Sequence, residues 1–305
     1  MKIFDVHTYA RRDKTNPEHL VSQMEKAEEE SQQWSSVDSK IYETIEKWYN
    51  ILKFPKKFDY QFKQALKDIK ISDSIKIENF KETTDGKLNL LSFLYMCEKL
   101  KSKYEDKKIP EEILTDTLSD ILIWNNIWSD IKDELYLGEC AWLKNHLSMK
   151  LFKLGRLQFC MGKAECDISH FNISKGDNVL EIHIPAVGPL TMEECERSIE
   201  YAKEFFSEYF PEFEYKCFTC HSWLLDKSLS AFLEPTSNIL KFQNMFEEIK
   251  TEESDAILKY VFTWNINRRK LISENPSSSF AAKVKEHALA DGKFYETLGI
   301  LKDVK

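Results

Sequence analysis

Glycine and proline are scarce in this sequence, with 8 of each among 305 residues. A chain so poor in both leaves little room for disordered or low-complexity segments. Hydrophobic residues make up 42% and charged residues 31% of the chain, which is typical of a globular protein. The length favours two domains, each with a core large enough to fold without a metal ion or disulfide bonds.

An excess of positive charge is also missing, because the formal net charge is -8. Binding to nucleic-acid phosphates needs a basic face, so we expect no nucleic-acid partner. Lysines do cluster between residues 53 and 70, but apolar residues form a stripe among them at helical spacing. This cluster therefore indicates the solvated face of a helix.

Long apolar runs are absent too. No stretch approaches the roughly 18 consecutive apolar residues of a membrane-spanning helix. The N-terminus carries Asp5, His7, Arg11 and Arg12 where an export signal would need an apolar segment. The seven cysteines are an odd number, which favours reduced thiols. We therefore expect a cytoplasmic protein without a membrane partner, and its oligomeric state stays open.

Helical patterns dominate the first 135 residues. Apolar residues recur three and four positions apart over 41–52, 90–100 and 114–135. This periodicity predicts an all-helical domain over residues 1–135 and a second domain over 136–305. In the second, we expect strands at 154–166, 179–185, 215–225 and 256–264, and helices at 191–209, 229–233, 238–249 and 280–290.

The most informative stretch runs from 178 to 226. A strand ends at Pro185, Gly188 supplies a turn, and Thr191 with Glu194 forms a capping box that opens a helix. A strand, a helix and a strand joined this closely predict a right-handed crossover with parallel strands. The groove beyond the carboxyl ends of such strands is where ligands of open α/β sheets usually bind.

Four strings carry a family resemblance: LGRLQF at 154–159, HIPAVGPL at 183–190, CHSWLL at 220–225 and SNILKF at 237–242. They resemble a bacterial two-domain acyltransferase-like family with a helical N-terminal domain and a GNAT-like C-terminal domain. The resemblance implies an α+β fold, in which an all-helical N-terminal domain is followed by a GNAT-like mixed β-sheet with flanking helices. It also implies a site for acyl-CoA as co-substrate.

In GNAT-type folds, backbone N–H groups at a helix N-terminus hold the pyrophosphate of coenzyme A, and the helix dipole supports this binding. The resemblance places that loop at six residues of this sequence, namely Pro185, Ala186, Val187, Gly188, Leu190 and Thr191. The loop departs from the family pattern, because Pro189 offers no N–H and Glu193 and Glu194 add negative charge. These departures favour an alternative, a non-catalytic binding or scaffolding protein with a degenerate coenzyme site.

Glu181 and His183 are two residues apart, so both side chains leave one face of the expected strand. A carboxylate beside an imidazole suits a general base that deprotonates an attacking ammonium. The structural alternative is a polar pair that fixes the loop.

On the next strand, Thr219, His221 and Trp223 share one face and Cys220, Ser222 and Leu224 share the other. This alternation lets His221 approach His183 and makes Ser222 a candidate proton donor to a leaving thiolate. A satisfied buried histidine and a serine that merely packs are the alternatives. Trp223 is a candidate for contact with substrate.

Arg156 and Gln158 also share one strand face, where they are candidates to bind the substrate. A guanidinium there suits a carboxylate or phosphate, and a structural ion pair is the alternative. The Cys217-x-x-Cys220-His221 pattern matches covalent haem attachment, but the export signal and a second axial ligand are missing. Two cysteines three apart on a strand face opposite sides, so we expect neither haem nor a metal ion.

These features together predict transfer of an acyl group from acyl-CoA to an amine of a small molecule or peptide. The acyl group would lie between the strands that end at Pro185 and Leu225. A cysteine acyl carrier or hydrolase at Cys220 is a weaker alternative, because no nucleophile elbow surrounds the thiol.

Overall fold

The computed structural model describes residues 36–69 and 74–302. The charged residues Asp5, His7, Arg11 and Arg12 therefore lie outside the described part. Within this part, residues up to 149 contain helices as their only regular elements: α3 (Ser36–Ile51), a 3-10 turn (Lys56–Phe58), α4 (Asp59–Lys67), α5 (Ser74–Asn79), α6 (Gly86–Asp106), α7 (Glu111–Leu118), α8 (Asp120–Lys132) and α9 (Cys140–Leu147). No helix of the described residues is long and apolar enough to cross a membrane.

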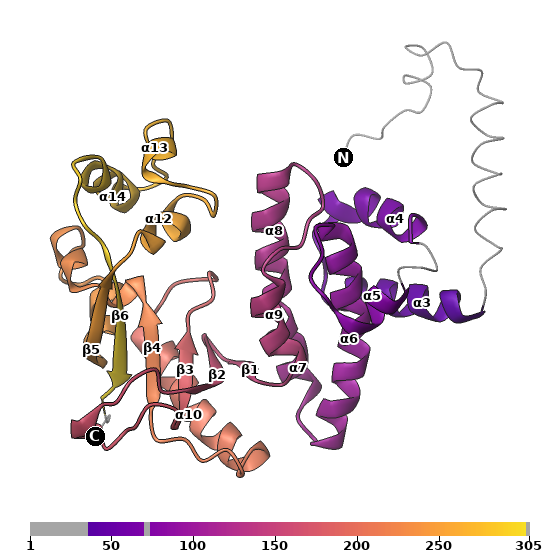
Figure 1. The fold of residues 1–305 in the computed structure, drawn as a ribbon, viewed down its shortest axis with the longest axis horizontal. Coiled ribbons are helices and arrows are strands. Elements are labelled where there is room, and N and C mark those ends of the chain that lie inside the picture. The colour runs from indigo at the N-terminus through magenta and orange to yellow at the C-terminus, as the bar shows by residue number, and fades with distance from the viewer. Residues whose placement is uncertain (1–35, 70–73, 303–305) are drawn as a thin grey trace.

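The predicted long helix over 114–135 is two helices. It breaks at Ser119, which ends α7 and begins α8, and α8 ends before Asp133, whose φ of 56° is left-handed. The break turns Asp120 inward, where it is buried. Helices α8 and α9 form the side of the helical part that faces the sheet (Figure 1).

A six-stranded sheet in the order β1-β2-β3-β4-β6-β5 forms the second part. Among the strands of the described residues, only β3 and β4 pair in parallel, and α10 (Met192–Tyr209) connects them, which confirms the predicted crossover. The other pairs are antiparallel. The strands are β1 (Leu151–Leu154), β2 (Leu157–Lys163), β3 (Asn178–His183), β4 (Phe218–Ser222), β5 (Phe246–Glu253) and β6 (Tyr295–Leu301).

Three sequence-based expectations for this part were wrong in whole or in part. The strand predicted at 154–166 is confirmed as β2 over Leu157–Lys163, but Leu154 ends β1, and the chain turns between them at Gly155 with a φ of 76°. The strand predicted at 256–264 is helix α12 (Ala256–Val261), which buries Ile257 and Leu258. The helix predicted at 238–249 stops after α11 (Asn238–Gln243), and β5 begins at Phe246. An exposed edge strand such as β5 lacks the apolar alternation that reveals a half-buried strand.

One apolar core joins the helices to the sheet. It contains residues of α3 and α6 as well as strand residues such as Phe152 and Phe159. Phe205 and Phe206 of α10 pack on Phe152, with ring centroids 4.8 and 5.8 Å apart. Burial of large aromatic rings is worth about 1.5–3 kcal/mol each, so this core fixes the helical part against the sheet.

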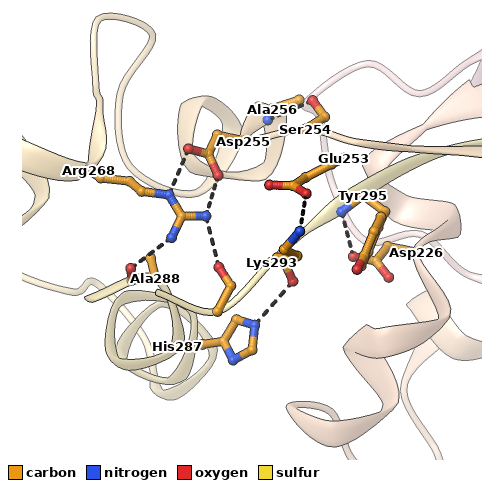
Figure 2. A network of polar contacts seen from close by, with 11 residues as sticks. Asp226, Glu253, Ser254, Asp255, Ala256, Arg268, His287, Ala288, Lys293 and Tyr295 are labelled. Atoms are coloured by element: carbon orange, nitrogen blue, oxygen red, sulfur yellow. Dashed lines mark hydrogen bonds and ion pairs between the residues drawn. The ribbon is translucent and has the colours of Figure 1, made fainter. Parts of the chain in front are cut away.

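The last helices, α12, α13 (Arg268–Leu271) and α14 (Ser279–Leu289), are held together by a polar network (Figure 2). Arg268 donates to both carboxylate oxygens of Asp255 at 2.6 and 2.8 Å. It also donates to the carbonyls of Ala288 and Gly292 at 2.9 and 2.8 Å. Bidentate pairing of this kind fixes geometry strongly, so one guanidinium ties α12, α13 and the end of α14 into a unit.

Candidate active site

The two parallel strands separate toward their carboxyl ends. They pair only at Leu180 with Phe218 and at Glu181 with Thr219. Beyond these pairs, β3 stays with β2 up to His183, while β4 stays with β6 up to Ser222. The sheet therefore opens between β3 and β4, at the place where ligands of α/β sheets usually bind.

A cavity of about 860 Å³ lies at this opening. Its volume is within the range of small-molecule and cofactor sites. Most of its lining comes from three parts of the chain: the ends of β3 and β4, the helices α8 and α9, and residues 259–264 at the end of α12 and after it. The β1–β2 hairpin and the start of α11 (Asn238–Gln243) supply the rest. Representative lining residues are Ile182, Ser222, Trp124, Trp142, Tyr260 and Trp264.

The Arg156 side chain donates hydrogen bonds to three carbonyl groups of the loop between β3 and α10 and so holds that loop in place. Its Nε donates to the Pro189 carbonyl at 2.9 Å, Nη1 to that of Pro185 at 3.1 Å and Nη2 to that of Gly188 at 3.3 Å. Burial lowers the pKa of this guanidinium from its ordinary value. The residue lies in the hairpin turn, so it does not share a strand face with Gln158, and its charge faces no carboxylate within ion-pair distance among the described residues.

The backbone N–H groups of the same loop are mostly free of protein partners. Val187 donates to the Pro185 carbonyl at 2.8 Å. Within the described part of the chain, the N–H groups of Ala186, Gly188 and Leu190 have no protein acceptor. Such amides beside a helix N-terminus attract anions.

Thr191 caps helix α10 as the sequence predicts. Its side-chain oxygen accepts from the Glu194 N–H at 3.4 Å and lies 2.5 Å from Glu194 Oε2. The other acidic residue of the first turn, Glu193, is 3.7 Å from Arg197. Both acidic side chains therefore have partners on the helix itself.

His183 and Glu181 lie on the same sheet face, with 3.5 Å between His183 Nε2 and Glu181 Oε2. The imidazole is half-buried and contacts the Trp142 ring edge to face, at 4.7 Å between centroids. His183 lines the cavity, whereas Nε2 is shielded from solvent and makes no hydrogen bond with the described residues. The geometry suits a carboxylate that orients an imidazole.

Sequence reasoning missed a buried cluster around Asp120. Its Oδ2 accepts from the indole N–H of Trp124 at 3.1 Å and of Trp142 at 2.9 Å, and His146 Nε2 lies 3.1 Å away. Burial acts to raise the pKa of Asp120, but His146, Trp142 and Gln158 outweigh it, so the pKa lies below its ordinary value. The sequence does contain one signal for this cluster, which is spacing. Asp120 and Trp124 are four residues apart on one helix, and so are Trp142 and His146 on the next.

The end of β4 supplies three more of the sequence-predicted residues to the cavity lining: His221, Ser222 and Trp223. His221 Nδ1 lies 3.5 Å from Glu165 Oε1. The Ser222 hydroxyl oxygen accepts from the Leu224 N–H at 3.1 Å. Because β4 ends at Ser222, Trp223 belongs to a 3-10 turn, and the expected strand face shared with His221 does not extend to it.

Cys220 is fully buried, and burial raises the pKa of its thiol well above the ordinary value. A thiol that holds its proton so firmly is a poor nucleophile. The geometry thus gives no support to a cysteine acyl carrier at this position.

Comparison with solved structures finds acyltransferases. One, in complex with decanoyl-CoA, is 28% identical over 70% of this chain and 64% of its own, with a TM-score of 0.61. A second, with decanoyl-CoA and teicoplanin, is 24% identical over 70% and 66%, with a TM-score of 0.63. A mutant acyltransferase with octanoyl-CoA is 19% identical over 85% and 88%, with a TM-score of 0.70. The chain thus spans slightly less than two thirds of the first two.

Comparison with curated proteins gives no match. Two family models do match, and together they span most of the chain. Residues 17–149 match the N-acyltransferase N-terminal domain, and residues 151–301 match the GNAT-like C-terminal domain. The chain belongs to the two-domain acyltransferase family that combines these two domains.

Proposed function

We propose that this protein is an acyl-CoA-dependent N-acyltransferase that acts on an amine of a small molecule or peptide. The observation that carries the proposal is the set of free N–H groups at Ala186, Gly188 and Leu190, beside a split between parallel strands that opens into a cavity of about 860 Å³. Its structural neighbours bind octanoyl-CoA and decanoyl-CoA, which supports the same class of co-substrate here.

In this proposal the loop from Pro185 to Thr191 binds the coenzyme pyrophosphate. The free amides and the N-terminus of α10 stabilise the negative charge. Arg156 contributes indirectly, because it engages the loop carbonyls and thereby leaves the N–H groups available. The acyl chain then extends into the split, against Ile182 and the apolar wall near Trp223.

The acceptor amine would enter beside the helical part. Glu139 and Asp130 of that part line the cavity, and carboxylates there favour a cationic amine over an anionic acceptor. One neighbour is in complex with both decanoyl-CoA and teicoplanin, which supports a small-molecule or peptide acceptor. Gln158 and Trp223, both at the cavity, are the side chains that we assign to acceptor contact.

The reaction would proceed by direct attack in a ternary complex. His183, oriented by Glu181, takes the proton of the ammonium so that the amine can attack the thioester carbonyl. A C–N bond forms and the C–S bond breaks. The Ser222 hydroxyl gives its proton to the leaving thiolate and takes up the second proton of the attacking nitrogen, and His183 then releases the first proton to solvent. That hydroxyl accepts a hydrogen bond from Leu224 N–H, so its own O–H remains available to donate. His221, across the split, is assigned to acceptor positioning.

A thermal shift with free coenzyme A, octanoyl-CoA and decanoyl-CoA tests the coenzyme site. Ligand at about 100 times its dissociation constant adds roughly 2.7 kcal/mol of stability, which raises Tm by several degrees. Absence of any shift at millimolar ligand would reject the coenzyme site. It would favour the alternative, a non-catalytic binding or scaffolding protein, for which Pro189 and the two acidic residues that follow are the supporting features.

The base is tested separately by His183→Ala and Glu181→Gln. Both variants should keep the coenzyme-dependent thermal shift and lose about 100- to 10,000-fold in the rate of acyl transfer to a panel of primary amines. Mass spectrometry of the acylated amine gives the readout. Unchanged rates in both variants would remove these residues from the mechanism.

A further inference from the structure

Three potential metal ligands lie together on one face of the sheet, next to the split. Cys160 of β2 stands directly opposite Glu181 of β3, and Gln158 stands opposite His183. Glu181 and His183 are two residues apart, so all three side chains of Cys160, Glu181 and His183 leave the same face. The sulfur, carboxylate oxygen and imidazole nitrogen of this trio lie within 4.8 Å of one another.

Two features show that the trio converges. His183 Nε2 is shielded from solvent and makes no hydrogen bond with the described residues, although Glu181 Oε2 is 3.5 Å away. The Glu181 carboxylate lies over Gly162, where any added Cβ would collide with it. A glycine at this strand position therefore provides the space in which the carboxylate reaches toward its two neighbours.

The combination of ligands selects the kind of ion. A thiolate, an imidazole and a carboxylate are the ligands that zinc uses, and three of them leave a fourth tetrahedral position open. Hard cations such as Mg²⁺ and Ca²⁺ prefer oxygen ligands and a larger number of them. We propose that Cys160, Glu181 and His183 form a binding site for a zinc-class divalent cation.

Burial, reinforced by Glu181, raises the pKa of the Cys160 thiol to about 12. The free thiol therefore carries its proton, and a cation has to displace it to form a metal–thiolate bond. Bound zinc would occupy both the carboxylate and Nε2. Glu181 and His183 could then no longer act as a base. Zinc therefore inhibits acyl transfer, a consequence that rests on the proposed function.

The test begins with binding to the chelator-treated full chain in the absence of coenzyme. Calorimetric titration with Zn²⁺ should show a single ion per chain, and Co²⁺ should give the charge-transfer absorption of a thiolate ligand. Both signals should disappear in Cys160→Ser and persist in Cys166→Ser, which removes a partly buried cysteine outside the trio. Equal binding by wild type and Cys160→Ser, or no zinc binding at all, would overturn the site.

Gly162→Ala provides a second variant that removes no ligand. The added methyl displaces the Glu181 carboxylate, which is the flexible end of a side chain, so the fold should persist. Zinc affinity should fall by about 10- to 100-fold, the usual effect of disturbing groups that orient metal ligands. Unaltered affinity in Gly162→Ala would exclude Glu181 as a ligand and contradict the three-ligand site.

The inhibitory consequence has its own readout. Acyl transfer by the metal-free protein should decline as zinc is added and return with chelator, and Cys160→Ser should stay active in zinc. Absence of transfer in the metal-free protein would reject the proposed function, whereas the titration would still decide the site.

Discussion

At the scale of single residues, Asp120 and Trp142 connect the helical part to His183 at the cavity. Asp120 collects hydrogen bonds from Trp124 and Trp142, and the Trp142 ring in turn packs on His183. A buried carboxylate is tolerated only where donors satisfy it. Asp120 therefore positions His183 through a tryptophan, without touching the imidazole.

Replacing Asp120 by Asn tests this role. Both indoles and His146 lie at one oxygen of Asp120, and an amide oxygen in its place lacks the negative charge, so the free energy of unfolding should fall by about 1–3 kcal/mol. The pKa of Asp120 in the folded protein is depressed below its ordinary value, so this stabilisation is complete above the ordinary aspartate pKa and is lost as pH falls through the folded pKa. Urea denaturation of both proteins should therefore show a difference that narrows in acid.

Asp130→Asn is the matched control, because Asp130 is exposed and its ion pair with Lys57 spans 3.4 Å. Surface pairs contribute little, so its stability should equal that of wild type. A pH-independent difference between Asp120→Asn and wild type would contradict the assignment of a depressed pKa.

At the scale of elements, the β1–β2 hairpin is the support of the proposed coenzyme loop. The Arg156 N–H donates to the Ser198 hydroxyl of α10 at 2.7 Å, and the Arg156 side chain reaches the loop carbonyls. The turn at Gly155 places its Cα close to Ser198, and an added Cβ would lie 2.8 Å from that hydroxyl oxygen. Hairpin, loop and helix α10 thus form one rigid support.

Replacing Arg156 by Ala should loosen this support. The variant loses three hydrogen bonds to the loop carbonyls, so the peptide groups of the loop can rotate. This rotation disorders the N–H groups that we assign to the pyrophosphate. We expect coenzyme A to bind about tenfold more weakly, or about 1.4 kcal/mol, by calorimetry. Lys153→Ala in the same hairpin, whose side chain makes no hydrogen bond or ion pair with the described residues, should bind as wild type does. Equal affinity in both variants would show that the loop holds its shape alone.

At the scale of the whole molecule, the cavity exists because three distant parts of the chain meet. Trp264, after α12, donates to Glu139 of the helical part at 3.0 Å and packs edge to face on Trp124 at 4.9 Å. Strands β3 and β4 supply the opposite wall. The polar network around Arg268 joins α12 and α13, the helices that precede and follow Trp264 in the chain (Figure 2).

Arg268→Ala should loosen the part of the cavity wall that residues 259–264 form. Four hydrogen bonds to Asp255, Ala288 and Gly292 are lost, so amide hydrogen exchange should speed up in residues 254–294 while α6 and β2 stay protected. Arg269→Ala, at an exposed neighbouring position, is the control. Uniform loss of protection across the chain would mean that the wall is part of the global folding unit.

Local patterns in the sequence were sufficient for the helical character of the first part, though not for the break at Ser119, and for the β3–α10–β4 crossover and the cap at Thr191. Each depends on residues close in the chain, where periodicity and capping chemistry operate directly. The same patterns failed for β5, an exposed edge strand, for helix α12, where a strand was predicted, and for the hairpin turn at Gly155, where one strand was predicted.

The sequence by itself determined the crossover between β3 and β4 and the family, because both are written in short strings and spacings. Only the tertiary structure decided which distant groups meet: Asp120 with Trp142 and His146 of another helix, Arg156 with the loop carbonyls, and Cys160 with Glu181 on the neighbouring strand. Those contacts join residues separated along the chain, and packing sets their geometry, which no local pattern encodes.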